Sequence, residues 1–210
     1  MSSRRAFLAV VPALVSAAIL RAVLVAPARA DDAAPRSLSY EEAESLSRKF
    51  KAIEIQSQSM RARKRESVLI TESELNSYLN LTYAPELPGI TDMDIRIDSE
   101  RIEARGLIDL ERVRGKVPAP SPWSPLALLR GKVPVELKGK LRTRDGFGTI
   151  EVEEAWIASI PVPMSFVEQI VASATRKPSQ PEGFDINAPF RLPYAVDRVR
   201  LETARAFLDF

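Results

Sequence analysis

Three carboxylates that lie close together in the chain, Glu151, Glu153 and Glu154, are the residues whose spacing could support acid–base chemistry. Two carboxylates held in different environments can serve as a general acid and a general base. The chain contains no Cys and no His, which excludes thiol nucleophiles, disulfides, His-based triads and zinc sites built from those residues. No phosphate-binding glycine loop or metal-ligand spacing is visible in the sequence, so we predict no cofactor and no metal site.

The Asp145-Gly146 dipeptide offers a structural explanation for these carboxylates, because Asp-Gly favours a two-residue β-hairpin turn. With that turn, two Lys–Glu pairs fall on one face of the hairpin and two apolar pairs fall on the other. The predicted pairs are Lys140–Glu151, Lys138–Glu153, Leu141–Ile150 and Val135–Trp156. In the same register Glu154 falls on the apolar face, where it is either a bulge position or a polar group that lines a cavity. We therefore interpret Glu151 and Glu153 as salt-bridge partners and predict that the protein is not an enzyme.

A second polar cluster lies in residues 69–80, LITESELNSYLN, and its features are those of a strand-to-helix corner. Residues 67–70 form a short predicted strand, Thr71 caps the following helix, and Glu74 at the third helical position completes a capping box. Asn76 lies beside the apolar face of this helix, and we expect its side chain to tie the helix to a neighbouring backbone. The apolar face itself is formed by Leu75, Tyr78 and Leu79.

The first predicted helix of the domain begins at Ser39, an N-cap candidate with Glu42 at the third helical position. Its apolar residues recur at helical spacing, so that one stripe faces the core. The stripe contains Ala43, Leu46, Phe50, Ile53 and Met60. After Ile55 the chain becomes polar and basic as far as Arg65, and this stretch is either a solvated surface or a contact with lipid head groups.

The remaining patterns predict strands and one further helix. Residues 95–98 and 101–111 alternate apolar and polar side chains, which is typical of a half-buried antiparallel sheet. Pro163 suits the first turn of an amphipathic helix whose apolar face runs to Ala174. Three extended segments follow at 190–194, 196–201 and 204–210, and we expect the last two to pair. The predicted fold class is therefore α+β.

Residues 115–134 fit no regular element. Their prolines forbid a central strand, yet several side chains in the segment are large and apolar. These are Trp123, Leu126, Leu128 and Leu129. We consider two interpretations: a flap that closes the end of the core, and a mobile lid or membrane-touching tip at the mouth of an apolar cavity.

The first thirty residues have the order of an export signal. An arginine pair precedes an apolar run that is too short for a typical membrane span, and Ala28-Arg29-Ala30 offers a cleavage site. The arginine pair also resembles a twin-arginine signal. Arg21 splits the apolar stretch, so retention as an N-terminal anchor is the alternative. We predict a signal at 1–30, a flexible lead at 31–38 and a single α+β domain at 39–210, in a periplasmic or secreted protein.

Cleavage of the signal would change the sign of the net charge. The whole chain has 30 basic and 28 acidic residues, and the first thirty residues contain four arginines and no acidic residue. The mature chain would therefore have 26 basic residues against 28 acidic ones, a net charge of −2. Such a balance provides no field for binding nucleic acid.

Four motifs, taken in order, resemble small bacterial envelope proteins related to the tubular lipid-binding (TULIP) superfamily. They are the T-E-x-E-L-N-x-Y-L corner, the Asp-Gly hairpin, the amphipathic helix that follows Ile160-Pro-Val-Pro163, and the closing L-P-Y…D-R-V-R-L-E hairpin. The resemblance covers about Glu66 to Phe210. It implies a strongly curved antiparallel β-sheet wrapped around one or two amphipathic helices, with an apolar groove for lipid tails.

On this resemblance we expect a non-enzymatic periplasmic or envelope protein that binds a lipid or another acyl-chain ligand in an apolar groove, with contact to a membrane surface as a further expectation. The alternative is a structural or assembly factor of the cell envelope whose sheet edge or apolar flap docks a protein partner. The candidate ligand-contacting side chains include the four apolar ones of residues 115–134. The others, each of which could equally belong to the plain core, are Ile108, Leu110, Val135, Leu137, Val152, Trp156, Phe166 and Ile170.

Overall fold

The computed structural model describes residues 37–58, 66–86, 89–113, 125–175 and 181–210. The predicted export signal, Met60 with the basic residues after it, and Trp123 lie outside the described residues. The described chain contains both helices and strands, and its strand pairings are all antiparallel. The predicted α+β class is therefore confirmed.

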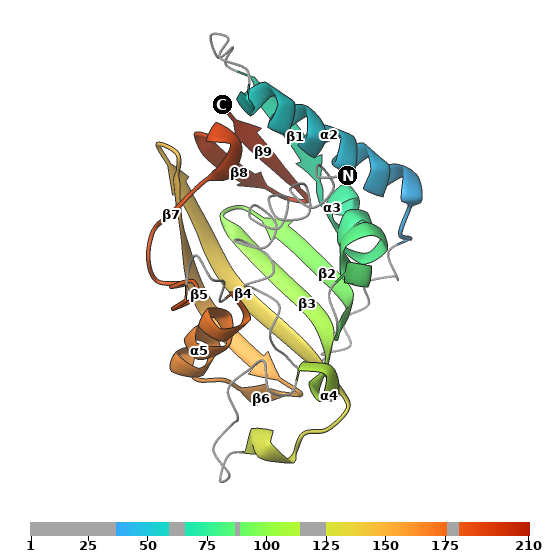
Figure 1. The fold of residues 1–210 in the computed structure, drawn as a ribbon, viewed down its shortest axis with the longest axis vertical. Coiled ribbons are helices and arrows are strands. Elements are labelled where there is room, and N and C mark those ends of the chain that lie inside the picture. Colours follow the sequence, from blue (N-terminus) through green and yellow to red (C-terminus); the bar gives the residue numbers. More distant parts are fainter. Residues whose placement is uncertain (1–36, 59–65, 87–88, 114–124, 176–180) are drawn as a thin grey trace.

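The strands form two sheets (Figure 1). The larger is six-stranded with the order β2-β3-β4-β5-β6, and the short strand β7 also pairs with β5. The smaller is three-stranded with the order β1-β9-β8. The strand bounds are Ser67–Thr71 (β1), Ile90–Asp98 (β2), Arg101–Asp109 (β3), Lys132–Arg144 (β4), Phe147–Ile157 (β5), Ile160–Pro161 (β6), Phe190–Arg191 (β7), Arg198–Glu202 (β8) and Arg205–Asp209 (β9).

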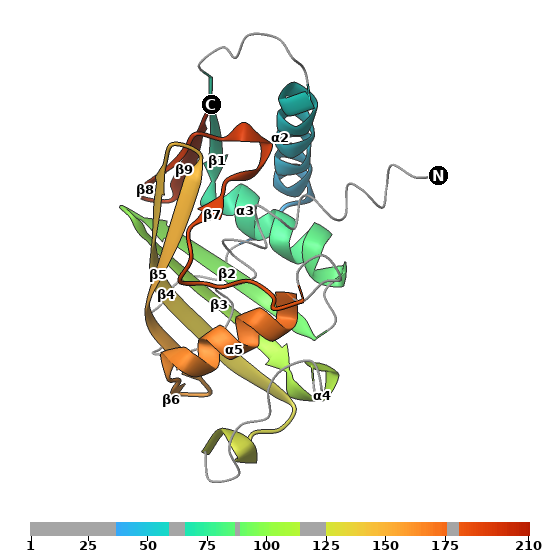
Figure 2. The ribbon, with the colours of Figure 1, turned by 60° about the vertical axis from the view of Figure 1, so that its left-hand side comes forward.

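The helices cover one side of these sheets. Figure 2 shows α2, α3 and α5 on the same side of the strands, and the hydrophobic core lies between them, with Leu46, Ile95 and Val167 among its most deeply buried side chains. A π-helix continues α3 directly. The helical bounds are Tyr40–Gln58 (α2), Glu72–Tyr78 (α3), Leu79–Tyr83 (η1, the π-helix), Ala84–Glu86 (η2), Leu110–Val113 (α4), Pro125–Leu128 (η3), Met164–Thr175 (α5) and Pro193–Ala195 (η4).

Helix α2 begins and packs as its sequence pattern predicts. The Ser39 hydroxyl accepts a hydrogen bond from the Glu42 amide at 3.4 Å, which makes Ser39 the N-cap. The Glu42 carboxylate in turn accepts hydrogen bonds from the hydroxyls of Ser73 and Ser77 on α3. The glutamate at the third helical position of α2 therefore links the two helices. The described part of the apolar stripe is buried, at Ala43, Leu46, Phe50 and Ile53.

The hairpin formed by β4 and β5 has the predicted register only near its turn. Leu141 pairs with Ile150 and Lys140 with Glu151, as expected, but the register then shifts between Lys138 and Gly139. Glu153 is the extra residue of this bulge. Two predicted pairs, Lys138–Glu153 and Val135–Trp156, are therefore wrong. The observed pairs beyond the bulge are Lys138–Glu154, Leu137–Ala155, Glu136–Trp156 and Val135–Ile157.

Burial explains the bulge. Without it, strict alternation would place one of the two consecutive carboxylates, Glu154, on the apolar face, where an unpaired charge is costly. The extra residue keeps both glutamates on the charged face, where Glu154 lies 3.4 Å from the ammonium group of Lys138. Gly139 permits this local geometry, because a Cβ there would lie 2.7 Å from the Glu151 carbonyl oxygen.

The predicted role of Asn76 is confirmed. Its Oδ1 accepts the Ile95 amide at 2.7 Å and its Nδ2 donates to the Ile95 carbonyl at 2.8 Å, so one buried side chain satisfies both backbone groups of a β2 residue. Asn80 bonds both backbone groups of Met93 in the same way, at 2.9 and 2.6 Å. A third contact extends the series, from the Ile97 amide to the Glu72 carboxylate at 2.6 Å.

These contacts form a regular series because the spacing of every fourth residue along the helix matches the spacing of every second residue along β2. Four helical residues rise about 6 Å, and two strand residues rise about 6.7 Å. Side chains at every fourth position of the helix therefore meet the backbone groups at every second position of β2. Since β2 is an edge strand of the larger sheet, the helix occupies backbone groups that could otherwise pair with another chain.

The predicted capping box is confirmed and extends into a larger cluster around Glu74. Thr71 Oγ1 accepts the Glu74 amide at 3.1 Å, and the Glu74 carboxylate accepts the Thr71 amide at 3.0 Å. The same carboxylate accepts the Lys49 ammonium and the Ser45 hydroxyl, each at 2.7 Å. Burial disfavours the charge on Glu74, but these hydrogen bonds outweigh it and hold the pKa of the carboxyl below its usual 4.5.

We expect this cluster to make the fold sensitive to acid. A carboxyl whose pKa is lower in the folded than in the unfolded chain contributes stability that is complete above the unfolded pKa and is lost as the pH falls through the folded pKa. Glu74→Gln should therefore cost about 1–3 kcal/mol at neutral pH, and the difference from wild type should narrow below pH 4.5. Urea unfolding between pH 3 and about pH 7 measures this. Glu44→Gln, at an exposed position of α2, is the control; an equal effect of both variants would contradict the prediction.

Candidate ligand-binding cavity

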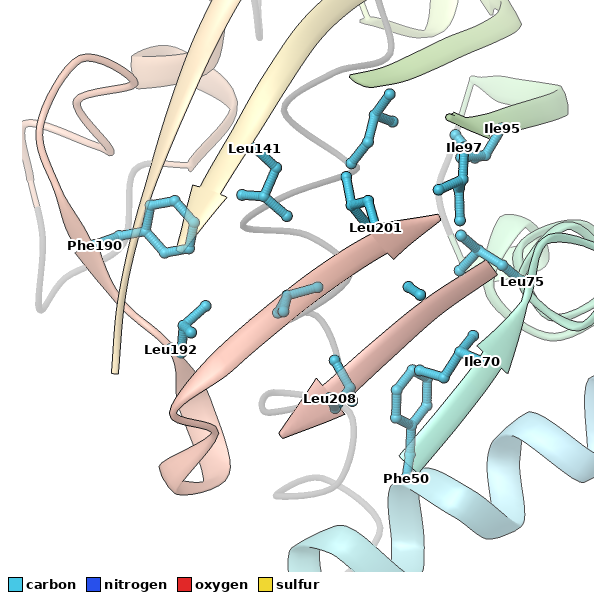
Figure 3. Close-up of a pocket in the computed structure, with 13 residues that line it drawn as sticks. Phe50, Ile70, Leu75, Ile95, Ile97, Leu141, Phe190, Leu192, Leu201 and Leu208 are labelled. Carbon is cyan, nitrogen blue, oxygen red and sulfur yellow. The ribbon is translucent and has the colours of Figure 1, made fainter. Parts of the chain in front are cut away.

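An apolar cavity lies where the smaller sheet meets one end of the larger sheet (Figure 3). Both sheets, two helices and the chain around β7 contribute side chains to its lining. Figure 3 shows Phe190 and Leu192 on one side of the space and Ile97 and Leu75 on the opposite side. The lining residues are Phe50, Ile70, Leu75, Ile95, Ile97, Ile102, Leu141, Phe190, Leu192, Val199, Leu201, Ala206 and Leu208.

The strands of the smaller sheet turn one face to the cavity because their side chains alternate with period two. On β8, Val199 and Leu201 line the cavity while Arg200 between them is directed to the other face, where its guanidinium bonds the Asp209 carboxylate at 2.7 Å. On β9, Ala206 and Leu208 line the cavity in the same way. The predicted pairing of the last two extended segments is confirmed by the β8–β9 ladder.

The cavity is small and without polar side chains. Its volume is about 80 Å³, roughly half that of an engineered apolar cavity of about 150 Å³ that accepts benzene. A buried space lined only by hydrocarbon offers nothing to a charged or hydrogen-bonding group. The apolar lining therefore suits a hydrocarbon ligand, and the volume suits the end of one hydrocarbon chain.

The lining of the cavity is least buried on the side of β3 and β8. All of the lining side chains are buried except Ile102, Val199 and Leu201, which are half-buried. Ile102 lies on β3, and the other two lie on β8. We infer from this burial pattern that the cavity has its mouth between β8 and the end of the larger sheet, and we call this place the slit.

Phe190 closes the cavity on the side of β5. Its ring lies directly over Gly148, where a Cβ would come within 2.6 Å of Phe190 Cζ. Phe184 packs edge-on against the same ring, with the ring centres 5.8 Å apart. The absence of a side chain at Gly148 thus gives this ring its place in the wall.

The predicted groove residues occupy a different part of the molecule. Four of them are buried and four are half-buried against the core, in strands β3 to β5, at α4 and in α5, and none lines the cavity. Trp156 was expected on the apolar face opposite Val135, but the bulge places it opposite Glu136 on the charged face. The buried ones are Ile108, Val135, Leu137 and Ile170, and the half-buried ones are Leu110, Val152, Trp156 and Phe166.

The predicted flap lies away from the cavity as well. Leu126 and Leu128 belong to the short helix η3, and the Leu128 side chain is 80% exposed. Leu129 is half-buried against the core. In Figure 1, η3 lies at the opposite end of the molecule from the smaller sheet.

The carboxylates that could have supported acid–base chemistry are ion-paired. Glu151 lies 3.4 Å from Arg142, and Glu153 pairs with Lys140. The hydrogen bond from Lys140 holds the pKa of Glu153 below its usual range, which makes it a weaker base. In the described ranges, acidic side chains do not gather in the groups of three or more that would hold a metal ion.

The most buried charge on the same face belongs to Glu136, which is 3% exposed. Arg105 Nε lies 2.9 Å from Glu136 Oε2, and Lys138 Nζ lies 3.2 Å from Glu136 Oε1. Burial disfavours the charge on Lys138, but Glu136 outweighs this and raises the pKa of the lysine. The cluster is a compensated ion-pair network on the sheet, with both carboxylate oxygens occupied.

The fold and the cavity define the class of this protein: an α+β protein with an apolar cavity at the junction of two antiparallel sheets. Comparison of the chain with protein-family models, with curated proteins and with solved structures found no match. Within the part of the chain that the structure describes, each helix is too short or too polar to cross a membrane.

Proposed function

We propose that this protein is a non-enzymatic envelope protein that binds an acyl-chain ligand, with the end of the chain in the cavity between the two sheets. The observation that carries the proposal is the lining: thirteen side chains from both sheets, two helices and the β7 segment surround one space, and all are apolar. A packed core of this size has no physical need for a void, since each void forfeits dispersion contacts.

Two expectations from the sequence belong to this proposal. One is export by the N-terminal signal, which would place the protein in the periplasm or outside the cell. The other is the resemblance to tubular lipid-binding proteins, with a strongly curved sheet wrapped around the helices. Both support a lipid ligand, because lipids are abundant in the envelope and because the resemblance implies a groove for their tails.

The size of the cavity restricts the ligand. A volume of about 80 Å³ is far below the roughly 300–1,000 Å³ of pockets that enclose a whole drug-sized ligand. The remainder of the chain and the polar head would therefore lie in the mouth, beside Ile102 and Leu201. A single-chain amphiphile such as a fatty acid satisfies these limits.

A docking function is the second candidate, and one observation favours it. Leu128 projects from η3 with 80% of its surface exposed, and the prolines around it were expected to keep this segment out of the sheet. A protein partner that covers Leu128 would bury that surface. This candidate does not use the cavity.

Purification of the protein from its own envelope fraction distinguishes the two candidates. We expect native mass spectrometry to find a chain that begins near Asp31 and carries an acyl-chain ligand. Removal of the ligand should lower the melting temperature, and added palmitate should restore it, because a ligand that binds only the folded state stabilises it by mass action. An unchanged melting temperature on delipidation, together with no palmitate uptake, would leave the docking function as the better proposal.

A further inference from the structure

The two sheets are joined along β8 by contacts at its two ends. At one end, Thr143 of β4 reaches β8: its Oγ1 accepts the Val199 amide at 2.8 Å and donates to the Val199 carbonyl at 2.8 Å. At the other end, the Ala204 amide donates to the Ile97 carbonyl at 2.9 Å, and the Thr203 hydroxyl donates to the Asp98 carboxylate at 3.0 Å. One threonine hydroxyl thus satisfies both backbone groups of a strand residue.

The backbone between these two joins faces the mouth of the cavity. The N–H and C=O of Val199 point away from β9, since both bond Thr143, and alternation directs those of Leu201 to the same side. β8 is an edge strand of the smaller sheet, so among the described residues no strand pairs with Leu201 on that side. The side chains beside this gap are the three half-buried lining residues, Ile102, Val199 and Leu201.

We propose that the acyl chain enters and leaves through this slit, and that the hydrogen bonds of Thr143 to Val199, the Thr143 clasp, control how often it opens. This inference rests on the proposed function. To open the slit at its Thr143 end, β8 must break the two hydrogen bonds of the Thr143 side chain and the hydrogen bond from the Gly146 amide to the Asp197 carbonyl, whereas separation of β8 from β9 would break a whole ladder. The Ala204–Ile97 and Thr203–Asp98 contacts hold the other end and act as the hinge.

The clasp is positioned to act on the cavity directly. Leu141, two residues before Thr143 on β4, lines the cavity, and so does Val199 itself. Movement of β4 away from β8 at Thr143 would therefore separate two wall residues. The β4–β5 turn is joined to the same region by hydrogen bonds of Gly146, to the Asp197 carbonyl and from the Leu192 amide, both at 2.8 Å.

The test compares rates with equilibrium uptake, using the full chain and cis-parinaric acid, a linear fatty acid whose fluorescence rises in an apolar site. Thr143→Val keeps the shape of the side chain and removes both hydrogen bonds. We expect it to raise both the association rate and the dissociation rate about tenfold in stopped-flow experiments. The dissociation constant should change less than about threefold, because a gate alters the barrier to entry and exit of the ligand and leaves the bound state unchanged. Thr143→Ser, which retains the hydroxyl, should behave as wild type.

Two further variants separate a gate from general loosening of the fold. Thr149→Val makes the same change on the same hairpin at an exposed position opposite Arg142, and should leave both rates unchanged. Leu201→Trp enlarges a side chain at the mouth and should slow both rates, an effect opposite to that of Thr143→Val. Acceleration by one variant and retardation by the other cannot both come from lost stability.

The outcomes distinguish this inference from the function on which it rests. If Thr143→Val shows normal equilibrium uptake and the same association and dissociation rates as wild type, the proposed portal, which is entry through the slit controlled by the Thr143 clasp, is wrong. The proposed function would still stand. A wild-type protein that takes up no parinaric acid would contradict both. Equal acceleration by Thr143→Val and Thr149→Val would also overturn the proposed portal, because Thr143 bonds Val199 of β8, whereas Thr149 lies at an exposed position of β5.

Discussion

Replacing Ala206 with Leu is expected to abolish acyl-chain uptake and at the same time to raise the stability of the ligand-free protein. Ala206 lies on β9, opposite Ile70 on one side and Leu201 on the other, and it lines the cavity with its small side chain. Three added carbon atoms would project into about 80 Å³ of apolar space. The variant therefore occupies the volume that the ligand needs.

The two effects have opposite signs, which makes this variant more informative than a truncation. Each buried methylene contributes about 0.8 kcal/mol, and cavity-filling substitutions commonly stabilise by about 0.5–2 kcal/mol. Urea unfolding of delipidated protein measures the gain, and titration with cis-parinaric acid measures the loss of uptake. A stabilised variant that still takes up the fatty acid would show that the ligand binds elsewhere.

A matched control is available on α2. Ala52→Leu adds the same atoms at an exposed position of the helix, away from the cavity lining. It should leave the uptake of cis-parinaric acid unchanged. It should change the free energy of unfolding by no more than about 0.5 kcal/mol. A destabilised Ala206→Leu protein would mean that the cavity is too rigid to accept the branched side chain, since overpacking costs about 1–3 kcal/mol.

The second large effect is expected from Asn76→Ala, which should destabilise the fold by about 2–5 kcal/mol. The Asn76 side chain is 1% exposed and bonds both backbone groups of Ile95. Its truncation removes both of these buried hydrogen bonds, and each such loss costs about 1–3 kcal/mol. Asn80 and Glu72 would still hold the neighbouring positions of β2, so we expect the variant to fold and to bind ligand.

The control for this variant is an asparagine that makes a surface contact. Asn187→Ala removes an exposed side chain that donates to Glu168 at 2.8 Å and should cost less than about 0.5 kcal/mol. Urea unfolding monitored by circular dichroism compares the two variants. An Asn76→Ala protein with an unchanged unfolding midpoint and no ligand uptake would show that Asn76 serves binding, contrary to our interpretation.

Local features of this fold follow from the sequence because neighbours in the chain decide them. The capping box of Thr71 and Glu74, the Ser39 cap and the apolar stripe of α2 each depend on residues within one or two helical turns. The same holds for the Asp-Gly turn and the first pairs beside it, such as Leu141–Ile150. The connection of Asn76 to a backbone was predicted, but which backbone it meets was not.

The register beyond the turn was mispredicted because a bulge is decided by burial. The consecutive Glu153 and Glu154 indicated a conflict with strict alternation, and the sequence allowed more than one resolution of it. The sheet resolves it by an extra residue at Glu153, which also moves Trp156 to the charged face. Both carboxylates are stabilised on the charged face because the lysines and arginines of β3 and β4 lie there and pair with them.

The amino-acid sequence by itself thus determined the α+β class, the helix caps, the core-facing stripe of α2 and the ion-paired nature of Glu151 and Glu153. Only the tertiary structure decided where the cavity lies, because its wall joins residues as far apart as Phe50 and Leu208. The pattern marks each of these side chains as apolar and inward-facing, but a void is the difference between the space the backbones enclose and the volume of the side chains within it. That difference depends on how the smaller sheet meets the larger one. The two sheets are joined by the contacts of Thr143 with Val199 and of Ala204 with Ile97, and these contacts link segments that no local sequence pattern connects.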